Sequence, residues 1–439
     1  MKIYIFNCNV ATLNFKIHLK KYSEVFIFCG KWAKKGVALI LFSLIAIYAD
    51  AQKDSIFKRT AIDTTRQKLN MDAVYNRPFL AVGKSPIAIG GYLEANTQYA
   101  STDGVTDGLS FQMRRMTLFF SSTIGKKIKF LSEIEFEDGT KEINLEFAAM
   151  DIEFHPLVNL RGGILMNPIG GFNQNHDGPR WDFIDRPISA TTIIPSTLSN
   201  VGFGLYGKYF SHNLIIGYEA YLTNGFDDKI ISNPENRTSL AAGKLGPERF
   251  EESNSGLPMF TGKIALRNRK IGELGFSYMT GVYNKFQEEG ITLDEKRRMS
   301  VMAIDFNTSF LKNRFTITGE LANVFVDVPE TYSQNFGTKQ FGGYIDFVGT
   351  IVQKPILDWN KAKINAVIRL EYADYNKGTF KETGGKISDD IWAIVPGIAF
   401  RPIGTTVLRF NYRFQQQTDL LGNPPAKTGA IQFGFSSYF

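Results

Sequence analysis

The last nine residues of the chain alternate strictly between two kinds of side chain. One set, in steps of two, is Ile431, Phe433, Phe435, Ser437 and Phe439, and the other is Gln432, Gly434, Ser436 and Tyr438. A β-strand sends the two sets to opposite sides of a sheet. An apolar side and a small, polar side on a strand that must be paired are typical of a closed barrel with lipid outside and water inside.

The same two-residue alternation recurs from Ile87 to the end of the chain. Segments of about 10–14 residues are separated by Gly, Asn, Asp or Pro clusters, for example at 89–99, 314–320, 364–372 and 407–414. Charged residues occupy positions in the middle of these segments. We therefore predict an all-β fold, a transmembrane antiparallel β-barrel of about sixteen up-and-down strands. A soluble β-sandwich is the alternative, but its strands mostly run about 3–10 residues.

The connections between these segments fall into two lengths, as an up-and-down barrel requires. Short connections, such as 124–126, 155–156, 211–212, 268–270 and 402–403, should be periplasmic turns. Long connections, such as 227–257, 283–296, 326–339, 376–389 and 416–427, should face outward. The pattern also slips phase near Ala148 and Ala149, which indicates a β-bulge.

The start of the chain has the features of a secretory leader. Lys34 and Lys35 precede a 13-residue apolar run, 36–48, and an Ala-x-Ala site that ends at Ala51. This order is typical of a signal peptide, and the apolar run is too short to span a bilayer. We predict a signal peptide at 1–51 with cleavage between Ala51 and Gln52, a periplasmic lead-in at 52–86, and a barrel at 87–439.

Charge and cysteine content exclude several kinds of function. Residues 1–51 carry a net charge of +5 of the total of +7, so the rest is nearly neutral and nucleic-acid binding is not indicated. Both cysteines, Cys8 and Cys29, lie in the predicted leader. The mature chain would then have no disulfide, no thiol nucleophile and no cysteine-bound zinc. We expect no metal and no cofactor.

One stretch, Met166–Asn200, breaks the strand rhythm. Its 35 residues are too many for an ordinary connection, and its prolines and aromatic residues indicate that it packs against other parts of the protein. A loop folded into the lumen would narrow a pore, and its charges would set the local field. An ordered outer loop is the alternative. The loop residues expected to line a constriction are Asp177, Arg180, Trp181, Asp182, Asp185 and Arg186.

The residues around this stretch resemble a known family. The strings Asn173-Gln174-Asn175-His176-Asp177, Phe183-Ile184-Asp185-Arg186-Pro187 and Gly202-Phe203-Gly204-Leu205-Tyr206-Gly207 are similar to the phosphate-selective porin O and P family in its Bacteroidetes-type form. The resemblance is clearest over about 110–220. It implies a sixteen-stranded outer-membrane porin, often a homotrimer, with an inward-folded loop. It also implies that Phe439 is the signal read by the barrel-assembly machinery.

Alternation places a mixed set of charges toward the predicted lumen. These residues are Arg115, Arg369, Arg409, Arg413, Glu94, Glu133, Glu320 and Glu371. Phosphate-binding members of the family carry ladders of Arg and Lys, so a mixed lumen argues against strong anion selectivity. The sequence thus predicts passage of small hydrophilic solutes or inorganic ions, with phosphate or other anions left open, through a barrel surrounded by outer-membrane lipid.

Two other classes of protein remain as alternatives. A barrel hydrolase would need a nucleophile with a His base, and the mature chain has only His155, His176 and His212. His176, in Asn-His-Asp-Gly, is consistent with a metal or base site, but a turn histidine that binds its neighbours is the simpler interpretation. A surface adhesin or structural protein would use the long outer loops. We expect no enzymatic activity.

Overall fold

The computed structural model describes residues 69–78, 87–125, 127–235, 237–245, 247–330, 337–380 and 383–439. These residues belong to one compact unit, 65–439. The predicted signal peptide with its Ala51–Gln52 cleavage site, and most of the predicted lead-in, lie outside the described residues. No helix among the described residues is long and apolar enough to cross a membrane.

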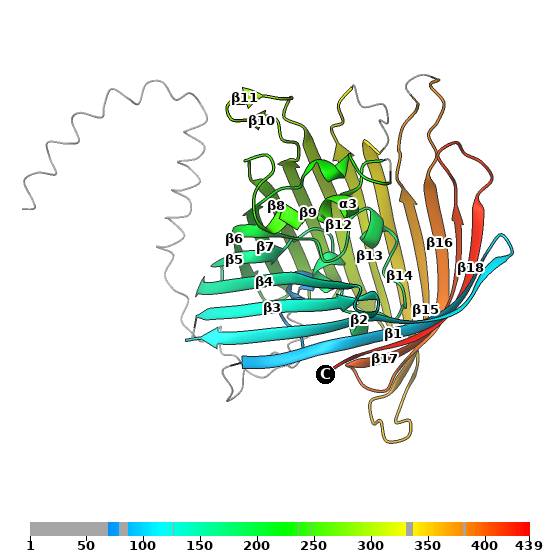
Figure 1. The fold of residues 1–439 in the computed structure, drawn as a ribbon. Helices are drawn as coiled ribbons and strands as arrows, with labels where there is room; N and C mark the ends of the chain where they lie inside the picture. Colours follow the sequence, from blue (N-terminus) through cyan, green and yellow to red (C-terminus); the bar gives the residue numbers. More distant parts are fainter. Residues whose placement is uncertain are drawn as a thin grey trace, which may run out of the picture. The chain divides into compact units, whose positions relative to one another are not determined.

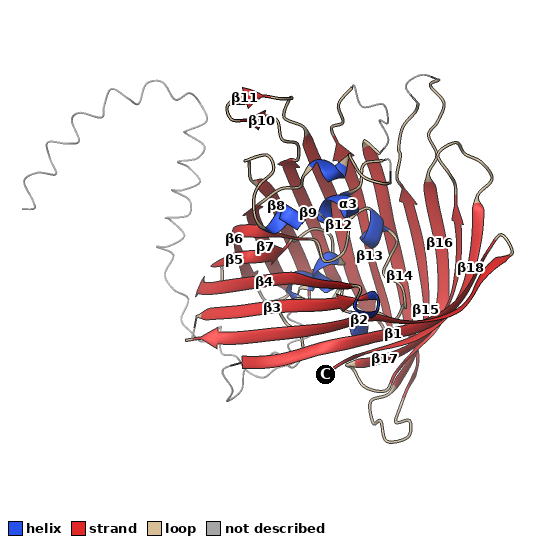
Figure 2. Ribbon diagram, viewed as in Figure 1, coloured by secondary structure: helices blue, strands red, loops and turns tan. Residues whose placement is uncertain are grey.

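Sixteen antiparallel strands close into a single barrel, which confirms the predicted fold class (Figures 1 and 2). The wall strands are β1 (Ile87–Thr102), β2 (Val105–Ile124), β3 (Ile128–Glu137), β4 (Glu142–His155), β5 (Val158–Met166), β6 (Ser199–Phe210), β7 (Leu214–Thr223), β8 (Met259–Asn268), β9 (Gly272–Val282), β12 (Arg298–Phe310), β13 (Phe315–Val326), β14 (Lys339–Gln353), β15 (Lys363–Asp374), β16 (Asp390–Arg401), β17 (Thr406–Gln417) and β18 (Ala426–Tyr438). Each pairs with its neighbour along the chain, and β18 returns to pair with β1.

Short elements lie in the connections and in the segment that precedes β1. They are the helices α2 (Ser189–Thr192) and α3 (Leu240–Lys244), the hairpin strands β10 (Gln287–Glu288) and β11 (Ile291–Thr292), and the 3-10 turns η4 (Asn70–Asp72), η5 (Asp138–Thr140), η6 (Asn173–Asn175), η7 (Gly178–Arg180), η8 (Asp228–Ile230) and η9 (Pro247–Phe250). Figure 2 shows several of the helical elements enclosed by the barrel wall.

The outer and inner faces of the wall differ from one residue to the next. Phe433 is 47% exposed and its neighbour Gln432 is 2% exposed; Ile304 is 45% exposed and Asp305 is 2% exposed. Period-two geometry therefore places apolar side chains outward and polar groups inward on these strands. A closed ladder leaves no strand edge unpaired, which is what a wall in contact with lipid requires.

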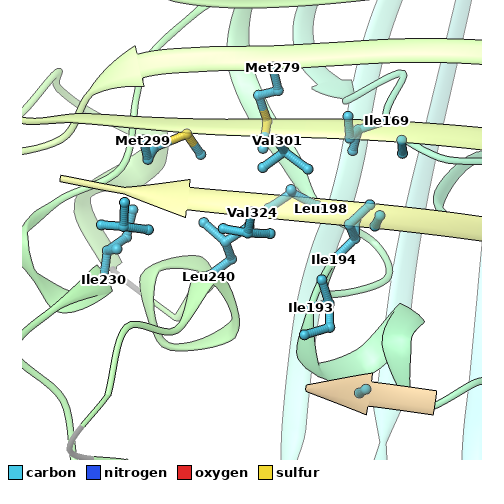
Figure 3. Packing of buried hydrophobic residues seen from close by; sticks show 14 of the residues in the cluster. Ile169, Ile193, Ile194, Leu198, Ile230, Leu240, Met279, Met299, Val301 and Val324 are labelled. Carbon is cyan, nitrogen blue, oxygen red and sulfur yellow. The ribbon is translucent and has the colours of Figure 1, made fainter. Parts of the chain in front are cut away.

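One sector of the inner face is apolar, so the expected polar lining does not hold there. Met279, Met299, Val301 and Val324 project inward from β9, β12 and β13 and are almost fully buried (Figure 3). They pack against side chains from two connections: Ile169, Ile193, Ile194, Leu198, Ile230 and Leu240. Since the connections cover this sector, its side chains meet protein rather than water. Burial of each large aliphatic side chain contributes roughly 1.5–3 kcal/mol.

A β-bulge alters which side chains of β4 face the lumen. On β4, Glu146 has no partner between Phe147, which pairs with Glu133, and Leu145, which pairs with Ile134. The bulge is therefore slightly before the predicted phase slip at Ala148 and Ala149. Because it adds a residue, Glu146 and Phe147 are both fully buried.

We predict that Ile304→Arg destabilises the barrel, because Ile304 lies at the middle of β12 on the outer face. The free energy of unfolding from lipid vesicles in urea should fall by about 2–4 kcal/mol, the cost of a cation near the bilayer midplane. Ile304→Leu, which conserves volume and polarity, is the control and should remain near wild type. Equal stability of the two variants would contradict the assignment of this face to lipid.

Candidate functional site

The connection between β5 and β6, residues Asn167–Leu198, lies inside the barrel and is called the inner loop here. Its backbone binds inward side chains of the wall. The Gly170 N–H donates to Ser277 Oγ at 2.9 Å, and the N–H groups of Gly171 and Phe172 donate to Glu320 Oε2 at 2.7 and 2.9 Å. Gly170 has a φ of +64°, and a Cβ there would lie 2.5 Å from Glu320 Oε2. Glycine is therefore required at this contact.

The far end of the inner loop is attached to a second part of the wall, β15 and β17. Ile184 donates its N–H to Asn411 Oδ1 at 2.9 Å, and Arg409 Nη1 donates to the Phe183 carbonyl at 2.6 Å. Arg369 Nη1 donates to the Asp185 carbonyl at 2.8 Å. The loop thus crosses from β9 and β13 to β15 and β17, as an inward-folded loop should.

Aromatic packing within the inner loop fixes its shape. Phe172 stacks on Trp181 with ring centroids 4.8 Å apart, and Tyr344 of β14 meets both rings edge-on at 6.3 and 6.4 Å. Trp181 Nε1 donates to the Asn175 carbonyl at 2.7 Å. Since these contacts order a loop that has no strand partner, its charged side chains hold defined positions.

Most arginines predicted to line the pore form ion pairs with carboxylates of neighbouring strands or of strands nearby in the wall. Arg369 binds Asp346 through two hydrogen bonds of 2.6 and 2.8 Å. Arg409 Nη2 donates to Glu94 Oε1 at 2.9 Å across β17, β18 and β1. Arg413 pairs with Glu371 at 2.7 Å. These side chains are nearly fully buried, so their charges are compensated within the wall.

Asp185 is the centre of a partly exposed polar cluster on the other side of the inner loop. Its carboxylate accepts from Arg114 Nη2 at 2.8 Å and from Gln432 Nε2 at 2.7 Å, and Arg413 Nη1 lies 3.6 Å away. Arg114 and Asp185 side chains are each 20% exposed. Burial alone would raise the pKa of Asp185, but Arg114 and Arg413 lower it below its ordinary value. The carboxylate is therefore charged at neutral pH.

A second group of charges faces this cluster along β2 and β3. Arg115 binds Glu137 at 2.8 Å and Glu94 at 3.1 Å. Arg186 of the inner loop lies 3.6 Å from Glu135 and 3.9 Å from Glu137. Basic and acidic groups of the inner loop and of the β1–β3 wall therefore pair with one another here.

Asp177 lies deeper, against the segment that precedes β1. Arg77 binds it through two hydrogen bonds, Nε to Oδ2 at 2.9 Å and Nη2 to Oδ1 at 2.6 Å, and Tyr438 donates its hydroxyl to Oδ2 at 2.6 Å. Burial would raise the pKa of Asp177, but the charge and hydrogen bonds of Arg77 hold it well below its ordinary value.

The residues predicted to line the pore all lie on the inner face or in the inner loop, at different degrees of exposure. Those with partly exposed side chains include Arg115, Arg180, Asp185 and Arg186, and Trp181 is also half-buried. Those buried in pairs or backbone contacts are Glu94, Glu133, Asp177, Asp182, Glu320, Arg369, Glu371, Arg409 and Arg413.

Phe439 is half exposed at the end of β18, on the outer face. Its N–H donates to the Gly91 carbonyl at 3.0 Å, and the Gly91 N–H donates to the Phe439 carbonyl at 3.1 Å. The last residue is therefore paired within the wall where β18 meets β1.

Two important arginines were missed by reasoning from the sequence. Arg114 reaches Asp185 because it is the extra residue between Met113, which pairs with Ala95, and Arg115, which pairs with Glu94. The sequence feature that could have identified Arg114 is the pair of adjacent arginines, Arg114 and Arg115, in an otherwise alternating strand. Arg77 lies in the predicted lead-in, and no local pattern marks its partners, Asp177 and Glu133, which are distant in sequence.

The structure does not favour a metal or base role for His176. Its side chain lies with the Glu133 and Asp177 carboxylates in a group whose ligand atoms are within 4.8 Å of one another. The Arg77 guanidinium occupies this group, 2.8 Å from Glu133 and 3.3 Å from His176 Nε2. His176 Nδ1 contacts the Asn173 carbonyl at 2.8 Å, within its own turn. An arginine already supplies the positive charge there.

Comparison with known proteins places the fold. No protein-family model matches the chain. An uncharacterised protein of Aquifex aeolicus is 32% identical over 210 residues, which are 46% of this chain and 46% of that protein. The chain thus matches less than half the length of this relative.

Solved outer-membrane barrels share the architecture. The anion-selective porin from Comamonas acidovorans has a TM-score of 0.50 and 12% identity, covering 80% of this chain and 99% of that one. Salmonella typhi OmpF, in complex with daunomycin, has a TM-score of 0.50 and 12% identity, covering 82% and 99%. At this identity the likeness shows the fold alone: the chain has the sixteen-stranded antiparallel barrel architecture that these porins share.

We predict that Asp177→Asn lowers the free energy of unfolding in vesicles by about 3–5 kcal/mol at pH 7, because it leaves buried Arg77 without its main partner. The folded-state pKa of Asp177 lies below its ordinary 3.8. Its stabilisation is therefore complete above that value and is lost as pH falls through the lower, folded-state pKa.

Urea unfolding of wild type and variant from pH 7 to pH 2 tests this. The difference between them should stay constant down to about pH 5 and shrink in stronger acid. Asp138→Asn, in the exposed turn η5, is the control. A difference that shrank between pH 7 and pH 5 would contradict the lowered pKa.

Proposed function

We propose that the protein is a passive diffusion channel of the outer membrane for small hydrophilic solutes and inorganic ions. The observation that carries this proposal is the partly exposed charged cluster formed by Asp185, Arg114, Arg115, Glu137 and Arg186 inside a barrel with an apolar exterior. A water-exposed polar surface enclosed by a membrane-spanning wall favours transport of polar solutes.

We infer that the channel has only a weak preference for the sign of the solute's charge. Arg369, Arg409 and Arg413 bind Asp346, Glu94 and Glu371, so their donors are engaged by the wall. An anion in transit would have to compete with these carboxylates. Phosphate and other anions therefore belong among the proposed solutes, but a dedicated phosphate ladder of the kind implied by the family resemblance is not supported by these pairs.

Assembly is proposed on the resemblance to porins. A homotrimer is the expected state, and the terminal Phe439 is the expected recognition signal for the barrel-assembly machinery. Removal of Phe439 should reduce the amount of folded protein in the outer membrane, and light scattering of the detergent-solubilised protein with the detergent contribution subtracted would give the number of copies.

A planar-bilayer recording of the purified protein tests the channel function. A diffusion channel gives stable ion current, whereas a surface adhesin or a barrel hydrolase without a water-filled path gives none. Reversal potentials in a KCl gradient, with and without phosphate, then give the ion preference. Absence of current from correctly folded wild-type protein, from folded Arg77→Ala and from folded protein that lacks 69–78 would together overturn the proposal.

We predict that Arg409→Gln together with Arg413→Gln shifts the reversal potential toward cation selectivity. The two changes remove two positive charges and leave Glu94 and Glu371 less compensated. Lys129→Gln, near the end of β3 and paired with Glu153, is the control and should cause a smaller shift. An unchanged reversal potential in the double variant would show that these charges do not influence the ion path.

A further inference from the structure

Residues Leu69–Pro78, called the N-terminal segment here, lie inside the barrel without joining its wall. The segment contains the turn η4 and packs against inward-facing side chains. Leu69 and Met71 are almost fully buried with Ile215 of β7 and Ala265 of β8. Part of the predicted periplasmic lead-in is therefore lodged in the lumen.

The first half of the segment is attached to the β6–β9 side of the barrel. The Asn70 N–H donates to Glu273 Oε1 of β9 at 2.8 Å, and Asp72 pairs with Lys208 of β6. The Asp72 carboxylate also accepts from the Leu69 N–H at 2.9 Å, which closes the turn. Polar contacts thus fix this end of the segment, together with the small apolar contact made by Leu69 and Met71.

The second half is attached to β2, β3 and the inner loop. Arg77 pairs with Asp177 and with Glu133 of β3, at 2.8 Å from the latter, and its guanidinium carbon lies 3.8 Å above the Phe119 ring of β2. Its side chain is completely buried. The segment therefore contacts one half of the ring of strands, from β9 to β2.

The middle of the segment binds the inner loop. The Val74 N–H donates to the Gln174 carbonyl at 3.0 Å, and Arg180 Nη2 donates to the Ala73 carbonyl at 3.0 Å. The Tyr75 ring lies 3.5 Å from the Arg161 guanidinium of β5. The segment, which contacts β2 to β9, and the inner loop, which contacts β13, β15 and β17, are therefore joined to each other inside the barrel.

The wall does not depend on the segment. β1 pairs directly with β18 over eleven residue pairs, and the described part of the segment contributes no strand to the barrel. Its contacts are side-chain pairs and single backbone hydrogen bonds that lie outside the backbone ladder of the wall. Release of the segment would therefore break the buried Arg77 pairs but leave the hydrogen bonds of the wall in place.

We propose that the N-terminal segment is a tethered plug: it closes the channel when Arg77 is bound to Asp177 and Glu133, and it opens the channel when Arg77 is released. This proposal rests on the channel function proposed above. Release would uncover two carboxylates, Asp177 and Glu133, in the lumen. Opening should therefore increase both conductance and preference for cations, whereas a nonspecific leak would change conductance alone.

Arg77→Ala tests the plug in planar bilayers. We expect single-channel conductance to rise by roughly two-fold or more, with the reversal potential shifted toward cations. Arg77→Lys, which keeps one charge but not the two-bond contact, should fall between the variant and wild type. Arg401→Ala is the matched control, because Arg401 is also an arginine that binds the inner loop. It donates hydrogen bonds to Asp182 and to the Pro179 carbonyl at 2.7 and 2.8 Å.

A second variant keeps the test decisive if Arg77→Ala fails to fold. Val74→Cys with Gln174→Cys allows a disulfide to hold the segment to the inner loop. The oxidised protein should stay in the low-conductance state, and a reductant should restore openings. Openings that persist after oxidation, absence of the disulfide under oxidant, or wild-type conductance in folded Arg77→Ala would each overturn the plug.

The two proposals fail in different ways. If the wild-type protein is silent while Arg77→Ala or the deletion of 69–78 conducts, the plug is supported and the wild-type channel is closed at rest. If wild type and both variants are folded but silent, the channel function itself is wrong. If all conduct alike, the channel stands and the plug does not.

Discussion

The pairing of β18 with β1 is the contact on which the rest of the structure depends. A backbone N–H or C=O left unpaired in hydrocarbon costs several kcal/mol, so a wall of strands in lipid must close on itself. The register that closes it runs from Tyr92 opposite Tyr438 to Thr102 opposite Thr428. Once this seam is set, alternation decides which side chains face lipid and which face the interior.

The interior is then filled in two different ways. Over β8, β9, β12 and β13, inward methionines and valines meet the apolar side of the connections and exclude water. Over β15, β17, β1 and β2, inward arginines meet carboxylates, and buried charges there are tolerated because each has a partner. The inner loop joins the two regions, with Ile193 and Leu198 in the first and Asp185 in the second.

The sequence was sufficient for the wall, and it singled out the 166–200 stretch, although an ordered outer loop stayed open as the alternative to an inward course. Alternation has a period of two residues and survives without knowledge of partners, so sixteen strands could be counted. It was insufficient for the contents of the barrel. Met299 and Val301 in an alternating strand do not reveal that a loop will cover them, and Arg77 cannot be matched to Asp177 from spacing alone. A bulge such as the one at Arg114 inserts one residue and so moves the following side chains to the other face of the strand. The alternation of residues in the sequence does not locate such a one-residue shift.

The apolar sector of the inner face also affects how the unfolded chain behaves before the barrel closes. Phe276 and Ile304 face outward on β9 and β12, while Met279 and Val301 face inward on the same two strands. Until β18 pairs with β1 and the connections pack inside the barrel, these strands expose apolar side chains on both faces. Adhesion between such strands would compete directly with insertion into the membrane, so these strands would be prone to aggregate before the barrel closes.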